Sequence, residues 1–384
     1  MAFHQFWESE MNFDFSDDQK MLKDQARKFL EDKCSYDDVR TVLESDDSHH
    51  DGVWNGLCEL GFAGAAIPEE FGGLGLGPLE LCVIAEELGR AAAPVPFSSS
   101  IYMFAEALKL TGSDEQKAAW LPQIATGEII GTLASAEGTQ APSPRTVKAS
   151  FSGGKLSGRK LPVPDGETAS VAVVLANTGG SGEQALSLVL VDLNQDGITR
   201  SAVETIDPTR GHAEINFNNA DASLLGTEGE GWDMLKRVEA GAAVLMAFEQ
   251  VGGTEAALNM AKDYSLDRYA FGRQIGSYQA IKHRLADMYV KLELARSNAY
   301  YGAMILSEDS AELELAAASA RISATEAYRF AAQECIQVHG GIGFTWEANP
   351  QFHYRRSKLL ALALGSASRW KDRLVSELEK SNVA

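Results

Sequence analysis

The stretch from Asp267 to Ile281 brings together the side chains best suited to chemistry. Arg268 offers a fixed fork of donors that suits a phosphate, and the ring of Phe271 suits the face of a heterocycle. Gln279 adds an amide that can donate and accept hydrogen bonds. These residues predict a site for an anionic ligand that carries a flat ring. The alternative is a plain helical corner whose arginine pairs with an acidic neighbour.

Two long helical patterns position this stretch. Apolar side chains spaced three and four residues apart follow it, at Ile281, Leu285, Met288 and Leu292, and that spacing defines one face of a helix. A mostly small-residue apolar stripe precedes it. Gly272 and Gly276 break the helix between them, and Ser277 is expected to cap the helix that follows. We therefore expect a helix–loop–helix corner.

Composition and charge exclude several classes of partner. The 384 residues suffice for two or three domains. A net charge of −20 disfavours nucleic acid and anionic lipid as partners. No apolar run approaches the length of a membrane span, and no secretion signal is recognisable. The four cysteines have no metal-ligand spacing, so we predict no metal site and a reduced, cytoplasmic protein.

The residue pattern along the chain changes twice, from helical to β-like and back to helical, and we expect an α+β multidomain fold. Residues 11–126 show helical patterns, beginning with Ser16 as an N-cap, and form an N-terminal helical domain. Residues 127–230 contain short β-like runs separated by glycine, aspartate and asparagine, which indicates a middle antiparallel β domain. In that domain, residues 152–155 (Ser-Gly-Gly-Lys) predict a hairpin turn.

Residues 231–384 return to helical patterns and predict a C-terminal four-helix bundle. The four expected segments span residues 232–266, 277–306, 311–339 and 350–378. The glycines Gly340 and Gly341 are expected to end the third segment, because glycine readily takes left-handed backbone conformations. Residues 1–10 are given no role.

Three blocks of sequence resemble the acyl-CoA dehydrogenase family. They are Ile-Pro-Glu-Glu-Phe-Gly-Gly-Leu-Gly at 67–75, Arg-Tyr-Ala-Phe-Gly-Arg-Gln-Ile from 268 with Gln-Ala-Ile from 279, and Gln-Val-His-Gly-Gly-Ile-Gly-Phe-Thr at 337–345. The blocks occur in the family's order and extend over most of the chain. The resemblance implies the same three-domain architecture.

This resemblance also implies a reaction, a cofactor and partners. Members of the family bind FAD and oxidise an acyl-CoA thioester to the trans-2-enoyl-CoA, with an acceptor such as an electron-transfer flavoprotein. A carboxylate removes the α-proton while the flavin accepts a hydride. The base works in a dry pocket, where donors stabilise the developing enolate charge. Each FAD lies across a subunit interface of a tetramer.

By the same resemblance, this chain supplies one half of such a shared site. Arg268 would meet the pyrophosphate, Phe271 would pack on the flavin side and Gln279 would hydrogen-bond along the cofactor. Gln337, Gly340 and Gly341 would sit by the adenosine and pyrophosphate, where the missing side chains allow close backbone approach. The two glycines could equally serve as an ordinary helix C-cap.

The other half of the family's site is not matched by this sequence. The position of the usual catalytic glutamate is held by Leu364, and the alternative position of the base on the first bundle helix by Ala242. The Trp-x-Thr that covers the flavin ring corresponds to residues 162–164, Pro-Val-Pro. Proline has neither an amide donor nor an aromatic face. The family's Ser/Thr-Glu-x-x-x-Gly-Ser-Asp corresponds to a divergent segment, residues 135–142.

No catalytic residue is therefore assigned. Glu239 and Glu249 lie near Ala242 on the same expected helix, and each is a candidate for a displaced base. Each is also an ordinary candidate for a structural carboxylate at a helix surface or interface.

Three hypotheses follow from this asymmetry. The first is a subunit of a heteromeric α2β2 acyl-CoA dehydrogenase, similar to bacterial enzymes for steroid or other bulky acyl-CoA thioesters, with FAD shared with a sister subunit. The second is a self-sufficient homotetrameric dehydrogenase with a displaced base. The third is a non-catalytic assembly subunit. A related flavin monooxygenase is a weaker fourth alternative.

Overall fold

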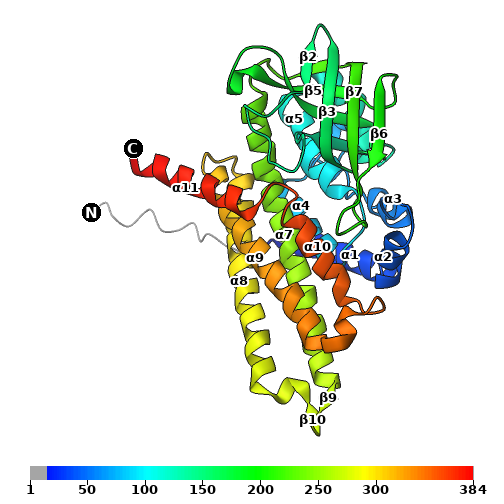
Figure 1. Cartoon of the computed structure of the whole chain (residues 1–384), viewed down its shortest axis with the longest axis vertical. Coiled ribbons are helices and arrows are strands. Elements are labelled where there is room, and N and C mark those ends of the chain that lie inside the picture. Colours follow the sequence, from blue (N-terminus) through cyan, green and yellow to red (C-terminus); the bar gives the residue numbers. More distant parts are fainter. Residues whose placement is uncertain (1–14, 384) are drawn as a thin grey trace.

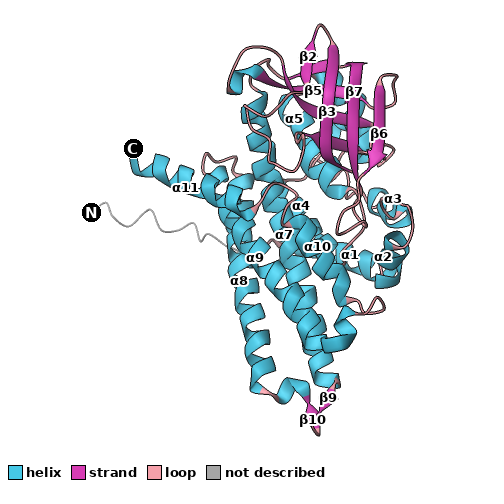
Figure 2. Ribbon diagram, in the orientation of Figure 1, coloured by secondary structure: helices cyan, strands magenta, loops and turns pink. Residues whose placement is uncertain are grey.

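The structure is a computed structural model that describes residues 15–383. The sheet lies at one end of the long axis and a small hairpin at the other, with long helices between them (Figure 1). Figure 2 shows how the strands are gathered in one region of an otherwise helical molecule. The expected start of the first domain at residue 11 lies outside the described residues.

The N-terminal region is helical, as predicted. Its elements are α1 (Asp17–Lys33), α2 (Tyr36–Leu43), α3 (Asp51–Glu59), η1 (Glu69–Phe71), α4 (Pro78–Arg90), the π-helical η2 (Ser98–Ala105), α5 (Glu106–Thr111) and α6 (Asp114–Ala125). Ser16 caps α1, because its Oγ accepts from the Gln19 amide while the Gln19 side chain accepts from the Ser16 amide. This confirms the predicted start of the first helix.

The middle region is one eight-stranded sheet, with strand order β6-β7-β3-β2-β4-β5-β8 and β1 beside β4. The strands are β1 (Gly131–Ala134), β2 (Ser150–Ser152), β3 (Lys155–Pro164), β4 (Val171–Asn177), β5 (Leu186–Asp192), β6 (Ile198–Ala202), β7 (His212–Asp221) and β8 (Ser223–Leu225), with the short η3 (Glu183–Ala185) before β5. Most pairs are antiparallel, but β1 and β2 each run parallel to β4. The predicted hairpin joins β2 to β3, with Ser152 opposite Lys155.

The C-terminal region is built on three long helices, α7 (Gly231–Asp267), α8 (Gln279–Ser307) and α9 (Leu313–His339). The fourth expected segment is two helices, α10 (Pro350–Leu360) and α11 (Ala367–Val383). Gly365 lies between them with φ +93°, a left-handed conformation that interrupts the helix. The N-terminal helices end at Ala125 and the sheet ends at Leu225, while the expected domain boundaries after residues 126 and 230 stay a prediction.

Two glycines let α4 pack tightly against α7. A Cβ at Gly89 would lie 1.9 Å from the Glu249 carbonyl oxygen, and one at Gly252 would lie 1.8 Å from the Glu86 carbonyl oxygen. Neither position can therefore carry a side chain without separating the helices. One large apolar core includes residues from the N-terminal helices, the sheet and the bundle, so the three regions are packed as one body.

Candidate functional site: a cofactor clasp and a closed junction

The corner between α7 and α8 is a tight hairpin. Strand β9 (Tyr269–Ala270) pairs with β10 (Arg273–Gln274), and η4 (Ile275–Ser277) leads into α8. Phe271 and Gly272 between the strands have φ +52° and +84°. Two consecutive positive φ values match a type I′ turn, whose twist suits a two-residue hairpin. The sequence predicted the corner but not this hairpin.

The hairpin presents the predicted ligand residues to solvent. The side chain of Phe271 is 99% exposed, and those of Arg268 and Gln279 are also exposed. Within residues 15–383, the guanidinium of Arg268 makes no hydrogen bond or ion pair. The corner is therefore not held by an arginine paired with an acidic neighbour, and its donors are available to an external anion.

The loop after α9 lies at the same end of the bundle. His339, the last residue of α9, stacks on Tyr264 of α7 with ring centroids 4.1 Å apart. A small apolar cluster that includes Val338 and Ile275 joins the end of α9 to the hairpin. Burial lowers the pKa of His339, which favours the neutral ring in this stack. The structure thus brings both predicted blocks of ligand residues to one end of the molecule.

That loop leaves room for a ligand. It forms the short helix η5 (Gly340–Phe344). A Cβ added at Gly340 or Gly341 would meet nothing within 4 Å, and Gln337 is exposed. The Gly340 amide also donates to the Gln337 carbonyl, so Gly340 caps α9 as well. We call the exposed set Arg268, Phe271, Gln279, Gln337, Gly340 and Gly341 the clasp.

The second region is the junction where the N-terminal helices, the sheet and the bundle meet. Its interior holds a cavity of about 20 Å³, which is room for about one water molecule. The lining comes from η2, β3, the start of β7, α7 and the end of α10. Pro164 and Ala363, beside the positions where the resemblance places the flavin cover and the base, are among the lining residues.

A buried ion pair lies against this cavity. Arg210, which lines it, donates to Glu249 of α7 at 2.9 Å and to the Ser98 hydroxyl at 2.9 Å. Both charged side chains are buried. The other oxygen of Glu249 has no hydrogen-bond partner among the described residues. Burial, and then the Glu249 carboxylate, raise the pKa of the neighbouring Tyr102 hydroxyl well above its usual range.

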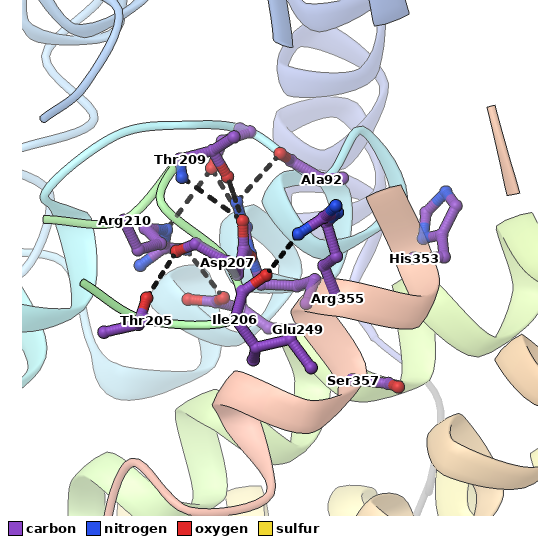
Figure 3. A network of polar contacts seen from close by, with 12 residues as sticks. Ala92, Thr205, Ile206, Asp207, Thr209, Arg210, Glu249, His353, Arg355 and Ser357 are labelled. Atoms are coloured by element: carbon purple, nitrogen blue, oxygen red, sulfur yellow. Dashed lines mark hydrogen bonds and ion pairs between the residues drawn. The ribbon is translucent and has the colours of Figure 1, made fainter. Parts of the chain in front are cut away.

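A second buried pair extends this network towards α10 (Figure 3). Arg356 donates to Asp207 at 2.6 Å and to the Thr209 hydroxyl at 2.9 Å. Its remaining donors reach the backbone oxygens of Ala92 and Ala93, both at 3.1 Å. Burial acts to raise the pKa of Asp207, but Arg356 and Thr209 outweigh it and the pKa is lowered. The carboxylate is therefore a charged structural group.

Both candidate bases form ion pairs with arginine. Glu249 is paired with Arg210. Glu239 accepts from Arg369 at 2.9 Å and from Arg373 at 3.1 Å, which ties α7 to the start of α11. Neither carboxylate lines the cavity. These contacts favour the structural interpretation of the two glutamates.

Two of the segments that depart from the family pattern are also engaged in contacts of their own. Leu364 is buried, and its carbonyl oxygen accepts from Arg369 and from the Trp370 indole. Glu137 accepts from the backbone amides of residues 148 and 149 and from Lys160 at 2.8 Å. Burial lowers the pKa of Lys160 to about 8, although Glu137 opposes the shift. Both segments thus make structural contacts within the chain.

The two regions differ in whether a flavin fits. Ligand pockets measure roughly 300–1,000 Å³, whereas the junction cavity measures about 20 Å³. Arg210 in its lining is already bonded to Ser98 and Glu249, so the residues present do not fit a flavin ring. The clasp fits the cofactor's chemistry, because it offers an unpaired guanidinium, an exposed aromatic ring and open glycine backbone.

Comparison with known proteins agrees with this architecture. The family model for the acyl-CoA dehydrogenase N-terminal domain matches residues 16–128. The model for the acyl-CoA dehydrogenase C-terminal domain matches residues 229–374. The fold and the two matches define a flavin-dependent oxidoreductase that acts on CH–CH bonds. The chain belongs to the acyl-CoA dehydrogenase family.

Individual relatives extend over nearly the whole chain. Acyl-CoA dehydrogenase IpdE2 of Mycolicibacterium smegmatis is 32% identical over 365 residues, which is 94% of this chain and 99% of that protein. The ChsE4–ChsE5 complex of Mycobacterium tuberculosis contains a chain with a TM-score of 0.88 and 26% identity, covering 96% of this chain and 99% of that one. A variant of the Tcur3481–Tcur3483 steroid acyl-CoA dehydrogenase matches with a TM-score of 0.86 and 29% identity, with the same coverage.

No helix in the described part of the chain is both long enough and apolar enough to cross a membrane.

Proposed function

We propose that this chain is the clasp-bearing subunit of a heteromeric acyl-CoA dehydrogenase. In this proposal FAD lies between the clasp and a sister subunit, and the sister supplies the catalytic base. The observation that supports it most is the contrast between an exposed, unpaired clasp and a junction closed around about 20 Å³. Two of the structures that this chain resembles are the ChsE4–ChsE5 complex and the Tcur3481–Tcur3483 steroid enzyme.

Each clasp residue has a defined task in the proposal. Arg268 neutralises the pyrophosphate, and Phe271 covers an apolar edge of the cofactor. Gln279 and Gln337 supply amides, while Gly340 and Gly341 admit the cofactor close to the backbone. When bound, the flavin supplies hydride acceptance and the protein supplies position and electrostatics. The substrate is an acyl-CoA thioester, and a steroid or similarly bulky acyl group is the class we propose.

Measuring FAD per chain tests this assignment. The chain should be purified alone and co-expressed with candidate sister dehydrogenases that carry Glu at the position matching Leu364 and Trp at the position matching Pro162. We expect little FAD alone and about one FAD per two chains in the complex, with turnover of an acyl-CoA only in the complex. Full FAD occupancy and turnover by the chain alone would refute the proposal.

A matched variant separates this proposal from a self-sufficient enzyme. Leu364→Glu restores a carboxylate at the family's position, but the closed junction still excludes cofactor and substrate. We therefore expect no turnover from the isolated variant. Appreciable activity would mean that the junction opens and that the chain lacks only its base.

A further inference from the structure

The hairpin of the clasp is held in a strained conformation by contacts from its own chain. Phe271 has φ +52°, and a left-handed conformation costs a residue other than glycine free energy. Its ring is 99% exposed, so packing within the chain does not compensate for the strain. Something in the surrounding structure must hold this turn in place.

Tyr278 supplies the contacts that reach both strands of the hairpin. Its hydroxyl donates to the Ala270 carbonyl at 2.9 Å, on the strand before the turn. The guanidinium of Arg273, on the strand after the turn, lies 3.9 Å from the centre of the Tyr278 ring. Tyr278 is also the residue that precedes the first turn of α8. One side chain therefore fixes the hairpin to a long helix.

The base of the hairpin is restrained independently. The Ile275 amide donates to the Arg268 carbonyl at 2.8 Å. A Cβ at Gly276 would lie 2.9 Å from the Ser265 carbonyl oxygen, so the chain passes close to the end of α7 there. These contacts restrain the base of the hairpin, while Tyr278 restrains the tip, which carries Phe271.

We propose that Tyr278 is a positioning residue that preorganises the clasp before the cofactor binds. It touches neither cofactor nor substrate in this scheme. It holds the turn that carries Phe271 in the orientation that binding requires, so less conformational freedom is lost on association. This inference rests on the proposed function for its consequence, but the restraint itself belongs to the chain alone.

Hydrogen exchange on the isolated full-length chain tests the restraint without any cofactor. Tyr278→Phe removes the hydroxyl and keeps the ring, whereas Tyr278→Leu removes both contacts. We expect amides of residues 269–274 to exchange about 3- to 10-fold faster in Tyr278→Phe, and faster still in Tyr278→Leu. Tyr289→Phe, an exposed tyrosine farther along α8, is the control and should change nothing. Unchanged exchange in both Tyr278 variants overturns the inference.

Titration with FAD of the complex with the sister subunit tests the consequence. The apparent affinity should fall in the Tyr278 variants in proportion to the fraction of hairpin that remains ordered, and most in Tyr278→Leu, because binding selects the ordered hairpin. A looser hairpin with unchanged FAD affinity also overturns the positioning role. If no complex of the wild-type chain takes up FAD, the proposed function fails, while the exchange experiment still decides whether Tyr278 holds the hairpin.

Discussion

The clasp and the junction each contain a key arginine, and the two arginines are in opposite states. Arg268 is exposed and has no polar partner among residues 15–383. Arg210 is buried and divides its donors between Glu249, Ser98 and a backbone oxygen. A charged group whose bonds are made stabilises the fold, whereas one whose donors are free can bind a ligand. The bonding state, more than the residue type, separates the two roles.

The same contrast holds for the shape of each region. The clasp is open around Gly340 and Gly341, while the junction is filled by the side chains of three regions of the chain. A homotetramer of closed junctions would leave every clasp without a complete site opposite it. A sister subunit with an open junction would complete the site, which is why the contrast favours a heteromer.

The largest expected effect comes from breaking the buried pair. Arg210→Met leaves Glu249 charged and unpaired in the interior, which should lower the free energy of unfolding by about 3–5 kcal/mol. Arg268→Met removes an exposed, unpaired arginine and should change it by less than about 0.5 kcal/mol. Urea denaturation measures both. The double variant Arg210→Met with Glu249→Leu should recover much of the loss, and equal losses in the two single variants would contradict the contrast.

The pH dependence of the free energy of unfolding distinguishes a buried side chain from an exposed one. His353 is buried between the hydroxyls of Tyr36 and Tyr328, and burial lowers its pKa to about 3. The unfolded chain, with a histidine pKa near 6.5, binds the proton more readily between these values. The contribution of His353 is therefore complete above about pH 6.5 and is lost as the pH falls towards 3, by up to about 4–5 kcal/mol.

Matched variants isolate that contribution. Unfolding free energies at several pH values between 7 and 4 should decline less steeply in His353→Gln than in the wild type. His283, exposed on α8 near the hairpin, is the control, and His283→Gln should leave the slope unchanged. A slope that does not depend on His353 would show that this histidine takes up its proton in the folded state.

The third effect concerns cofactor binding. Arg268→Met should weaken FAD binding to the complex by about 10- to 100-fold, the value expected for a charge-assisted hydrogen bond of about 1.5–3 kcal/mol. Fluorescence titration with FAD measures it, and Arg159→Met on the sheet, which loses an exposed ion pair with Glu214, is the control. Equal FAD affinity in Arg268→Met and wild type would show that Arg268 does not contribute to cofactor binding.

The smallest effect has opposite signs for stability and binding. Phe271→Asn places Asn-Gly in the type I′ turn, the pair that this turn prefers. The free energy of unfolding should rise by up to about 1 kcal/mol because the left-handed conformation costs asparagine less. FAD binding should weaken because the exposed ring is lost. A variant that loses stability instead would show that Phe271 packs within the fold.

The clasp residues fall in two contiguous blocks, so the sequence could group them, and their role in binding a cofactor stays a prediction. Arg268, Phe271 and Gln279 lie within one short stretch, and the glycines follow Gln337 closely. Local spacing also predicted the long bundle helices and the Ser16 cap. The clustering of both blocks at one end required the structure, because it depends on the contact between Tyr264 and His339.

The junction could not be predicted in the same way. Arg210 and Glu249 are 39 residues apart, and Asp207 and Arg356 are 149 residues apart, so no local pattern links them. The hairpin strands are too short for periodicity to reveal. The expected Ser277 cap was wrong, because the residue before α8 is Tyr278 and the Ser277 hydroxyl donates to the Gln274 carbonyl instead. The sequence pattern is helical on both sides of Gly365, so the break between α10 and α11 was not expected.

The close crossing of α4 and α7 at Gly89 and Gly252 has a consequence for biosynthesis. The two glycines are about 160 residues apart in the chain, and translation at about 5–20 residues per second separates their emergence from the ribosome by on the order of ten seconds or more. During that interval the apolar face of α4 has no helix to cover it. We therefore expect chaperones to bind the nascent N-terminal helices until α7 has been made, and a fragment that ends before α7 to aggregate.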